Sequence, residues 1–142
     1  MQNEVEFLVE GQQLVKRHDR ILAEVSGEFG MNKTELAVLM FLSENPEKDT
    51  ARDIVEGRLL TKSCVSKTID SLVRQDYLIT REDPGDRRVL HLEIQEKARE
   101  AARAGVKAQK DMMTVLEGGI TDQEKEVFFQ ILQKILKNIK EL

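Results

Sequence analysis

The sequence predicts a mainly α-helical fold that contains one small β-hairpin. Charged residues make up 34% of the 142-residue chain, hydrophobic residues 40%, and there are only two prolines, which favours a helical globular protein. Apolar residues recur at helical spacing near both ends, whereas residues 77–94 alternate in polarity around a turn signal. The length suits a single domain over residues 1–142.

The first helix is expected over residues 4 to about 25. Its apolar residues recur in pairs every seven residues, at Phe7/Leu8, Leu14/Val15 and Ile21/Leu22. This spacing suits packing against a helix of a second subunit or against the chain's own core, and both interpretations stay open. Gly27 and Gly30 are expected to end the helix.

The second helix is expected between a cap at Asn32 or Thr34 and a stop at Asn45-Pro46. It is too apolar for a surface helix, because its residues include Leu36, Val38, Leu39, Met40, Phe41 and Leu42. We therefore expect this helix in the core.

A helix-turn-helix is expected next along the chain. Thr50 begins a short helix in which Asp53 supplies a carboxylate to the N-terminus, and Gly57 breaks it. Thr61 caps the following helix, residues 61–75. Two short helices joined by a turn that contains glycine have the proportions of this motif.

The helix of residues 61–75 has two different faces. At about 100° per residue, one side collects Val65, Ile69, Leu72 and Val73, and the other collects Ser63, Lys67, Asp70 and Arg74, with Ser66 on the flank. Lys62 lies nearer the apolar side, but its long stem can splay outward. The outward face is small and basic near its N-terminus, which is the part that would meet base edges in a DNA major groove.

A β-hairpin is expected over residues 77–82 and 88–94. Leu90, Leu92 and Ile94 alternate with His91 and Glu93, which is the pattern of a half-buried ribbon. Between the strands, Asp83-Pro84-Gly85-Asp86 is a strong turn signal, followed at once by Arg87 and Arg88.

Two long helices are expected at the C-terminal end. The first runs from Gln95 to about Glu117 and ends at Gly118-Gly119, and the second begins with a capping box at residues 121–124. The last helix carries a wide apolar face: Val127, Phe128, Ile131, Leu132, Ile135, Leu136, Ile139 and Leu142. This apolar face is wider than one subunit needs for its own core, and dimerisation would cover it.

The charge of the chain is uneven. Residues 58–88 carry seven basic and five acidic side chains, a net charge of +2, although the whole chain carries −4. A local basic face on an acidic body can bind phosphates. No apolar run approaches the roughly 20 residues of a membrane span, the acidic N-terminus is no secretory signal and a single cysteine excludes an internal disulfide, so a cytoplasmic location is expected.

The segment SCVSKTIDSLVRQDYLITREDPGDRRVLHLEI, residues 63–94, resembles the multiple-antibiotic-resistance regulator (MarR) family of winged-helix transcription factors. The matching positions are Ser63, Val65, Ser66, Lys67, Leu72, Tyr77, Leu78, Asp86, Arg88, Leu92 and Ile94. The resemblance implies a winged helix-turn-helix core at about 32–94, flanked by dimerisation helices at about 4–25 and 95–142. Asp76 replaces the glycine that usually follows the recognition helix, and aspartate tolerates the left-handed backbone needed there.

The resemblance also implies a function. It implies a homodimeric repressor that binds an inverted repeat in double-stranded DNA and responds to a small effector, often an aromatic acid. The two recognition helices would lie in major grooves roughly 34 Å apart. The residues expected at DNA are Thr61, Lys62, Ser63, Ser66 and Lys67 on the recognition helix and Arg87 and Arg88 on the wing, with Asp86 as a support that orients a wing arginine. No cofactor is expected.

Two alternatives stay open. One is a winged-helix module that binds protein in place of DNA. The other is a redox-sensing regulator that uses Cys64, which lies at a helix N-terminus between Lys62 and Lys67. His18 and His91 lack the spacing of a metal site, and no nucleophile–base arrangement points to an enzyme. The operator, the regulated genes and the effector are not encoded in any recognisable motif.

Overall fold

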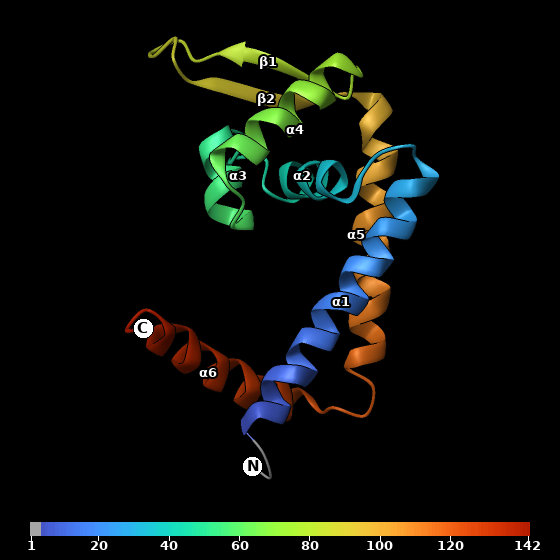
Figure 1. The fold of residues 1–142 in the computed structure, drawn as a ribbon, viewed down its shortest axis with the longest axis vertical. Helices are drawn as coiled ribbons and strands as arrows, with labels where there is room; N and C mark the ends of the chain where they lie inside the picture. The colour runs from blue at the N-terminus through green and yellow to red at the C-terminus, as the bar shows by residue number, and fades with distance from the viewer. Residues whose placement is uncertain (1–3) are drawn as a thin grey trace. The chain divides into compact units, whose positions relative to one another are not determined.

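The computed structural model describes residues 4–142 and confirms the predicted fold class, a mainly α-helical chain with one two-stranded antiparallel sheet (Figure 1). The elements in chain order are α1 (Glu4–Glu28), α2 (Lys33–Glu44), α3 (Ala51–Arg58), α4 (Lys62–Arg74), β1 (Leu78–Glu82), β2 (Leu90–Ile94), α5 (Glu96–Leu116) and α6 (Asp122–Ile139). The contacts divide the chain into two compact units, residues 1–111 and 112–142. Helix α5 runs from the first unit into the second, and α6 lies within the second.

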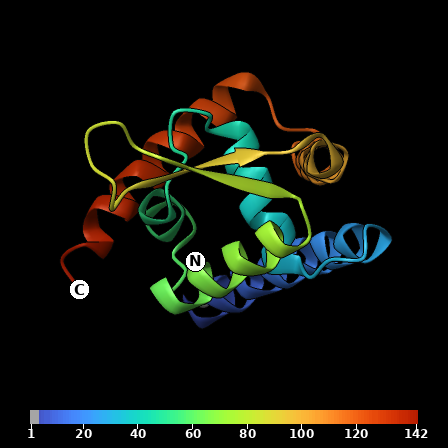
Figure 2. The same ribbon diagram turned by 90° about the horizontal axis from the view of Figure 1, so that it is seen from above.

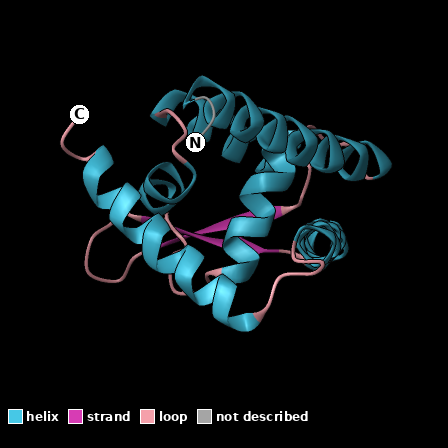
Figure 3. Cartoon of the chain, turned by 90° about the horizontal axis from the view of Figure 1, so that it is seen from below, coloured by secondary structure: helices cyan, strands magenta, loops and turns pink. Residues whose placement is uncertain are grey.

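Helix α2 lies in the core of the first unit, as predicted. Leu36, Val38, Leu39 and Met40 are completely buried, and the helix contacts α1, α3, α4 and β2. The hairpin rests on α4 through β1 and on α2 through β2, and Figure 2 shows it from above with α4 beside it. Among the described residues these are the only two strands (magenta in Figure 3). The apolar α2 therefore supports the helix-turn-helix and the hairpin together.

Side-chain caps begin α2, α3, α4 and α6, as the sequence predicts. Capping boxes join Asn32 to Glu35 before α2, Thr50 to Asp53 before α3 and Thr121 to Glu124 before α6. Before α4, the Cys64 N–H donates to Thr61 Oγ1 at 3.1 Å. Each cap satisfies N–H groups that have no partner within the first helical turn, which typically stabilises a helix by about 1 kcal/mol.

Helix α1 is longer than predicted, because it continues through Gly27 to Glu28. The prediction that Gly27 ends the helix was wrong, since a glycine inside a helix costs only about 1 kcal/mol and the adjoining turns can offset that cost. Gly30 is the glycine that ends it, with a φ of +67°. Across this left-handed turn the Met31 N–H donates to the Ser26 carbonyl oxygen at 3.0 Å.

Asp76 takes the left-handed conformation predicted for the end of the helix-turn-helix, with a φ of +61°. The Tyr77 N–H donates back to the Leu72 carbonyl oxygen at 2.9 Å, so Tyr77 belongs to the turn that follows α4. Its inclusion in the first strand was therefore wrong, and β1 starts at Leu78. The sharp turn redirects the chain from α4 into the hairpin.

The second strand also starts later than predicted, at Leu90. The Val89 N–H donates to the Asp86 carbonyl oxygen at 3.0 Å, which holds residues 87–89 in the turn. Assigning Arg88 and Val89 to the strand was wrong, because the hydrogen bond within the turn already uses the Val89 N–H. In the antiparallel register Arg81 lies opposite His91.

The second unit leaves the apolar side of α6 exposed. None of the α6 residues is buried, and seven of its large apolar side chains are each at least 41% exposed: Val127, Phe128, Phe129, Ile131, Ile135, Leu136 and Ile139. Lys125 Nζ lies 2.8 Å from Glu117 Oε2 across the turn between α5 and α6, and this contact raises the pKa of Lys125. A contiguous apolar face of this kind typically marks an interaction surface.

Candidate nucleic-acid interface

The N-terminal half of α4 presents a polar face to solvent. The predicted recognition residues are all exposed there: Thr61, Lys62, Ser63, Ser66 and Lys67. On the opposite side Val65 and Leu72 are completely buried and anchor the helix on the core. The exposed face combines two lysine charges with the positive end of the helix, where anions bind favourably. That these five residues contact DNA stays a prediction.

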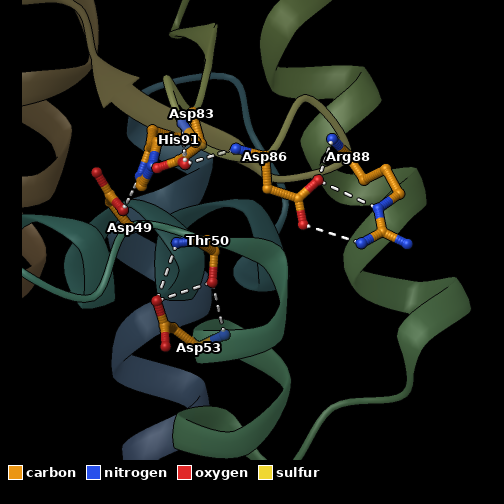
Figure 4. A network of polar contacts seen from close by, with 8 residues as sticks. Asp49, Thr50, Asp53, Asp83, Asp86, Arg88 and His91 are labelled. Atoms are coloured by element: carbon orange, nitrogen blue, oxygen red, sulfur yellow. Dashed lines mark hydrogen bonds and ion pairs between the residues drawn. The ribbon is translucent and has the colours of Figure 1, made fainter.

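The turn between the strands, the wing, is organised by two aspartates (Figure 4). Asp83 Oδ2 accepts hydrogen bonds from the Gly85 N–H at 2.9 Å and the Asp86 N–H at 3.0 Å. Asp86 in turn accepts from the Arg88 backbone N–H at 3.0 Å and from its guanidinium, Nε at 3.1 Å and Nη2 at 3.2 Å. The two-point contact with Arg88 lowers the pKa of Asp86. The orienting contact expected of Asp86 is thus present, while Arg87 and Arg88 remain exposed.

A cleft of about 940 Å³ lies between α3, α4 and the hairpin, within the first unit. Its apolar wall includes Val55, Ile69 and Leu90. Lys62 from α4 and Arg88 from the wing line the same cleft. The structure therefore brings one predicted recognition-helix cation and one predicted wing cation around a single depression, although they are 26 residues apart in the sequence.

A buried carboxylate fixes the far end of α4. Glu35 is only 5% exposed, and its Oε1 accepts a hydrogen bond from the Asn32 N–H at 3.0 Å as part of the α2 cap. Its Oε2 accepts from Ser71 Oγ at 3.1 Å and from Gln75 Nε2 at 2.8 Å. Glu35 belongs to the capping box of α2, where it lies three residues from Asn32. Its second task, holding α4, has no local sequence signal.

His91 is the main site residue that the sequence analysis missed. Its Nδ1 lies 2.7 Å from Asp49 Oδ1, in the loop before α3, and its Nε2 lies 2.8 Å from Asp83 Oδ1, at the start of the wing turn (Figure 4). Hydrogen bonds to Asp49 and then to Asp83 raise the pKa of His91, against a smaller opposing effect of burial. The hairpin register could have placed His91 near Asp83, whereas nothing local connects it to Asp49.

The other titratable candidates stay apart from this arrangement. Cys64 is half-buried and unbridged in the first turn of α4, and its redox role stays a prediction. Within residues 4–142, no group of three histidine, cysteine, aspartate or glutamate residues could hold a metal ion. No helix in the same described part of the chain is long and apolar enough to cross a membrane.

Sequence comparison adds an independent observation. Residues 29–89, which include α2, the helix-turn-helix and β1, match the sequence model of the MarR family. The transcriptional regulator AdcR of Streptococcus pneumoniae is 26% identical over 131 residues, which cover 90% of this chain and 88% of AdcR. The similarity therefore extends well beyond the helix-turn-helix.

Solved structures of MarR proteins share the fold. A MarR protein from Peptoclostridium difficile matches 98% of this chain and 90% of its own, with a TM-score of 0.81 and 22% identity. A putative MarR family regulator from Listeria monocytogenes, solved with 26mer DNA, matches 94% of this chain and 89% of its own, with a TM-score of 0.82 and 18% identity. The chain is therefore similar to the MarR family in sequence over residues 29–89 and in fold over nearly its whole length.

Proposed function

We propose that this chain binds double-stranded DNA sequence-specifically and regulates transcription as a homodimer on an inverted repeat. The observation that carries the proposal is the convergence of Lys62 on α4 and Arg88 on the wing around one cleft. A recognition helix in a major groove with an adjacent basic wing uses these two positions together. The structure of the Listeria protein with this fold, solved with 26mer DNA, supports DNA as the partner.

The chemistry of the two elements suits different parts of a duplex. Ser63, Ser66 and Lys67 offer short hydroxyl groups and a mobile cation, which can donate to base edges and phosphates. Arg88 uses two of its five side-chain N–H groups on Asp86, so the rest stay available to acceptors in a minor groove. Because Asp86 holds the guanidinium in place, less conformational freedom is lost when Arg88 meets DNA.

The dimer would be built from the terminal helices. Besides the α6 face, the apolar stripe of α1 is exposed in a single chain, with Phe7 at 58%, Leu8 at 64% and Val15 at 59% exposed. Burial of such side chains in a dimer interface stabilises the dimer by about 25 cal/mol per Å² of apolar area removed from water. Two copies would thereby place two recognition helices roughly one DNA turn apart.

The further proposal is that the regulator is a repressor released by a small effector, an aromatic acid in keeping with the family resemblance. Such an effector acts only if it binds the state that cannot hold DNA more tightly than the state that can. Binding assays with and without simple aromatic acids test this part separately.

Selection of bound duplexes from a random pool tests the main proposal. We expect enrichment of an inverted repeat, and an absence of enrichment at low salt would overturn the proposal. On the enriched duplex, Arg88→Ala and Lys67→Ala should weaken binding and lower the slope of log affinity against log salt by about one per lost phosphate contact. Lys107→Ala, which removes an exposed lysine paired with Asp111 on α5, is the control and should leave the slope unchanged.

A second candidate is a module that binds protein through the same face. Leu59, in the turn between α3 and α4, is 92% exposed, which is unusual for a large apolar side chain beside a polar helix. This candidate predicts that Arg88→Ala and Lys67→Ala retain function while Leu59→Ser loses it. The same set of variants therefore separates the two candidates.

A further inference from the structure

His91 joins three segments that are separate in the sequence. It lies on β2, opposite Arg81 of β1, and bridges Asp49 in the loop before α3 to Asp83 at the start of the wing turn. The Leu92 N–H also donates to the Asp49 carbonyl oxygen at 2.8 Å, so loop and strand are joined twice. We call His91, Asp49 and Asp83 the His91 clamp. Its side chains are about one-third exposed, at 35%, 31% and 32% respectively.

The geometry of the clamp requires a doubly protonated ring. Both ring nitrogens lie within 2.8 Å of a carboxylate oxygen, and an ionised carboxylate can only accept hydrogen bonds. A neutral imidazole carries one N–H and would direct its other nitrogen's lone pair at the second carboxylate. The bridge is therefore complete only in the imidazolium form.

The clamp is connected to the tip of the wing. Asp83 uses Oδ1 for His91 and Oδ2 for the N–H groups of Gly85 and Asp86. Asp86 then holds the backbone and guanidinium of Arg88. A continuous line of hydrogen bonds thus runs from the loop before α3 to the arginine that we place at DNA (Figure 4).

We propose that His91, Asp49 and Asp83 position the wing against the helix-turn-helix, and that protonation of His91 completes this positioning, so that DNA binding weakens as the ring deprotonates. The proposal rests on the proposed function for its effect on DNA, but the ordering of the wing does not depend on DNA. No group in the clamp is a predicted DNA contact.

The pH range follows from the charges around His91. Besides the two clamp aspartates, the charged side chains that line the adjacent cavity of about 420 Å³ are Arg81 on β1, Glu93 on β2 and Arg99 on α5. Arg81 Nε lies 2.8 Å from Glu93 Oε2, so these two charges largely offset each other. A raised pKa means that the clamp is complete below the ordinary histidine value of about 6.5. It is lost as the pH rises through the raised value.

The first experiment uses the protein without DNA. Because the chain has two histidines, the His18→Gln variant leaves His91 as the only histidine whose ring can be followed in an NMR titration. We expect its midpoint above about 6.5 and, by ¹⁵N relaxation, an increase in the mobility of residues 84–88 as the ring deprotonates. A midpoint at or below that value would overturn the proposal. So would a mobility of residues 84–88 that does not change as His91 titrates.

Asp83→Asn is the decisive variant. The asparagine oxygen can still accept from Gly85 and Asp86, while its amide N–H donates to the lone pair of a neutral His91. We therefore expect a lower His91 midpoint and a wing that stays ordered after the ring loses its proton. His91→Gln, checked for folding by thermal unfolding, cannot donate to both carboxylates and should leave the wing mobile at every pH.

The second experiment measures affinity for the selected inverted-repeat duplex by fluorescence anisotropy. From about pH 6 to about pH 9, we expect affinity to fall about fivefold for wild type and for His18→Gln. Asp83→Asn and His91→Gln should show no such fall. A fall in all variants, or in none, overturns the proposed effect on DNA. If no protein binds any duplex, the proposed function fails, and the NMR titration alone decides the clamp.

Discussion

Gln75 Nε2 donates to Glu35 Oε2 at 2.8 Å, joining the last turn of α4 to the first turn of α2. Ser71 Oγ donates to the same oxygen at 3.1 Å. The N-terminal half of α4 faces solvent, so its orientation depends on contacts made at the other end and on the buried apolar side. A carboxylate that satisfies two side chains and a helix cap in a buried position is costly to remove.

Glu35→Ala is therefore expected to lower the free energy of unfolding by about 2 kcal/mol, because three donors lose their acceptor at a buried position. Urea denaturation followed by circular dichroism measures the change. Glu44→Ala, an exposed glutamate in the last turn of the same helix, is the control and should change stability by less than about 0.5 kcal/mol. Equal effects of the two substitutions would contradict this role of Glu35.

Asp76→Gly is expected to stabilise the protein by about 0.5–1 kcal/mol. Asp76 has a φ of +61°, a conformation that costs a residue with a Cβ atom more than it costs glycine. The matched control is Asp70→Gly, an exposed position inside α4, where glycine should destabilise by about 1 kcal/mol. The prediction fails if both substitutions shift the denaturation midpoint in the same direction.

Gly57→Ala is expected to destabilise the protein by about 1–3 kcal/mol, although alanine is normally the better helix former. A Cβ atom at position 57 would lie 2.3 Å from Phe41 Cε2, so the ring that packs under α3 must move. Gly27→Ala supplies the contrast, because the space around that position of α1 is open. This substitution should raise the free energy of unfolding by about 0.5–1 kcal/mol. Thermal unfolding of both variants would reveal opposite shifts.

Ile131→Glu is expected to convert a dimer to monomers at micromolar concentrations. Ile131 is 50% exposed on the apolar side of α6, and placing two charges in the proposed interface would weaken association by at least about a hundredfold. Sedimentation velocity over a concentration series measures the change. Gln133→Glu adds the same charge at another exposed position of α6 and should leave the dimer intact. A monomeric wild-type protein would refute the dimer itself.

Much of the architecture could be predicted from local patterns. The caps at Asn32, Thr50 and Thr61, the apolar α2 and the left-handed turn at Asp76 each depend on residues within a few positions of one another. Boundaries were less predictable, as at Gly27 and Tyr77, because neighbouring turns compete for the same backbone hydrogen bonds.

The sequence by itself determined which residues of α4 and the wing face solvent, because helical periodicity and turn chemistry are local properties. Only the tertiary structure decided how these two surfaces are held. The contacts of His91 with Asp49 and of Gln75 with Glu35 join residues 42 and 40 positions apart. A polar side chain can pair with any suitable group, and only packing on α2 brings these distant partners together. No spacing in the sequence therefore predicts such a pair.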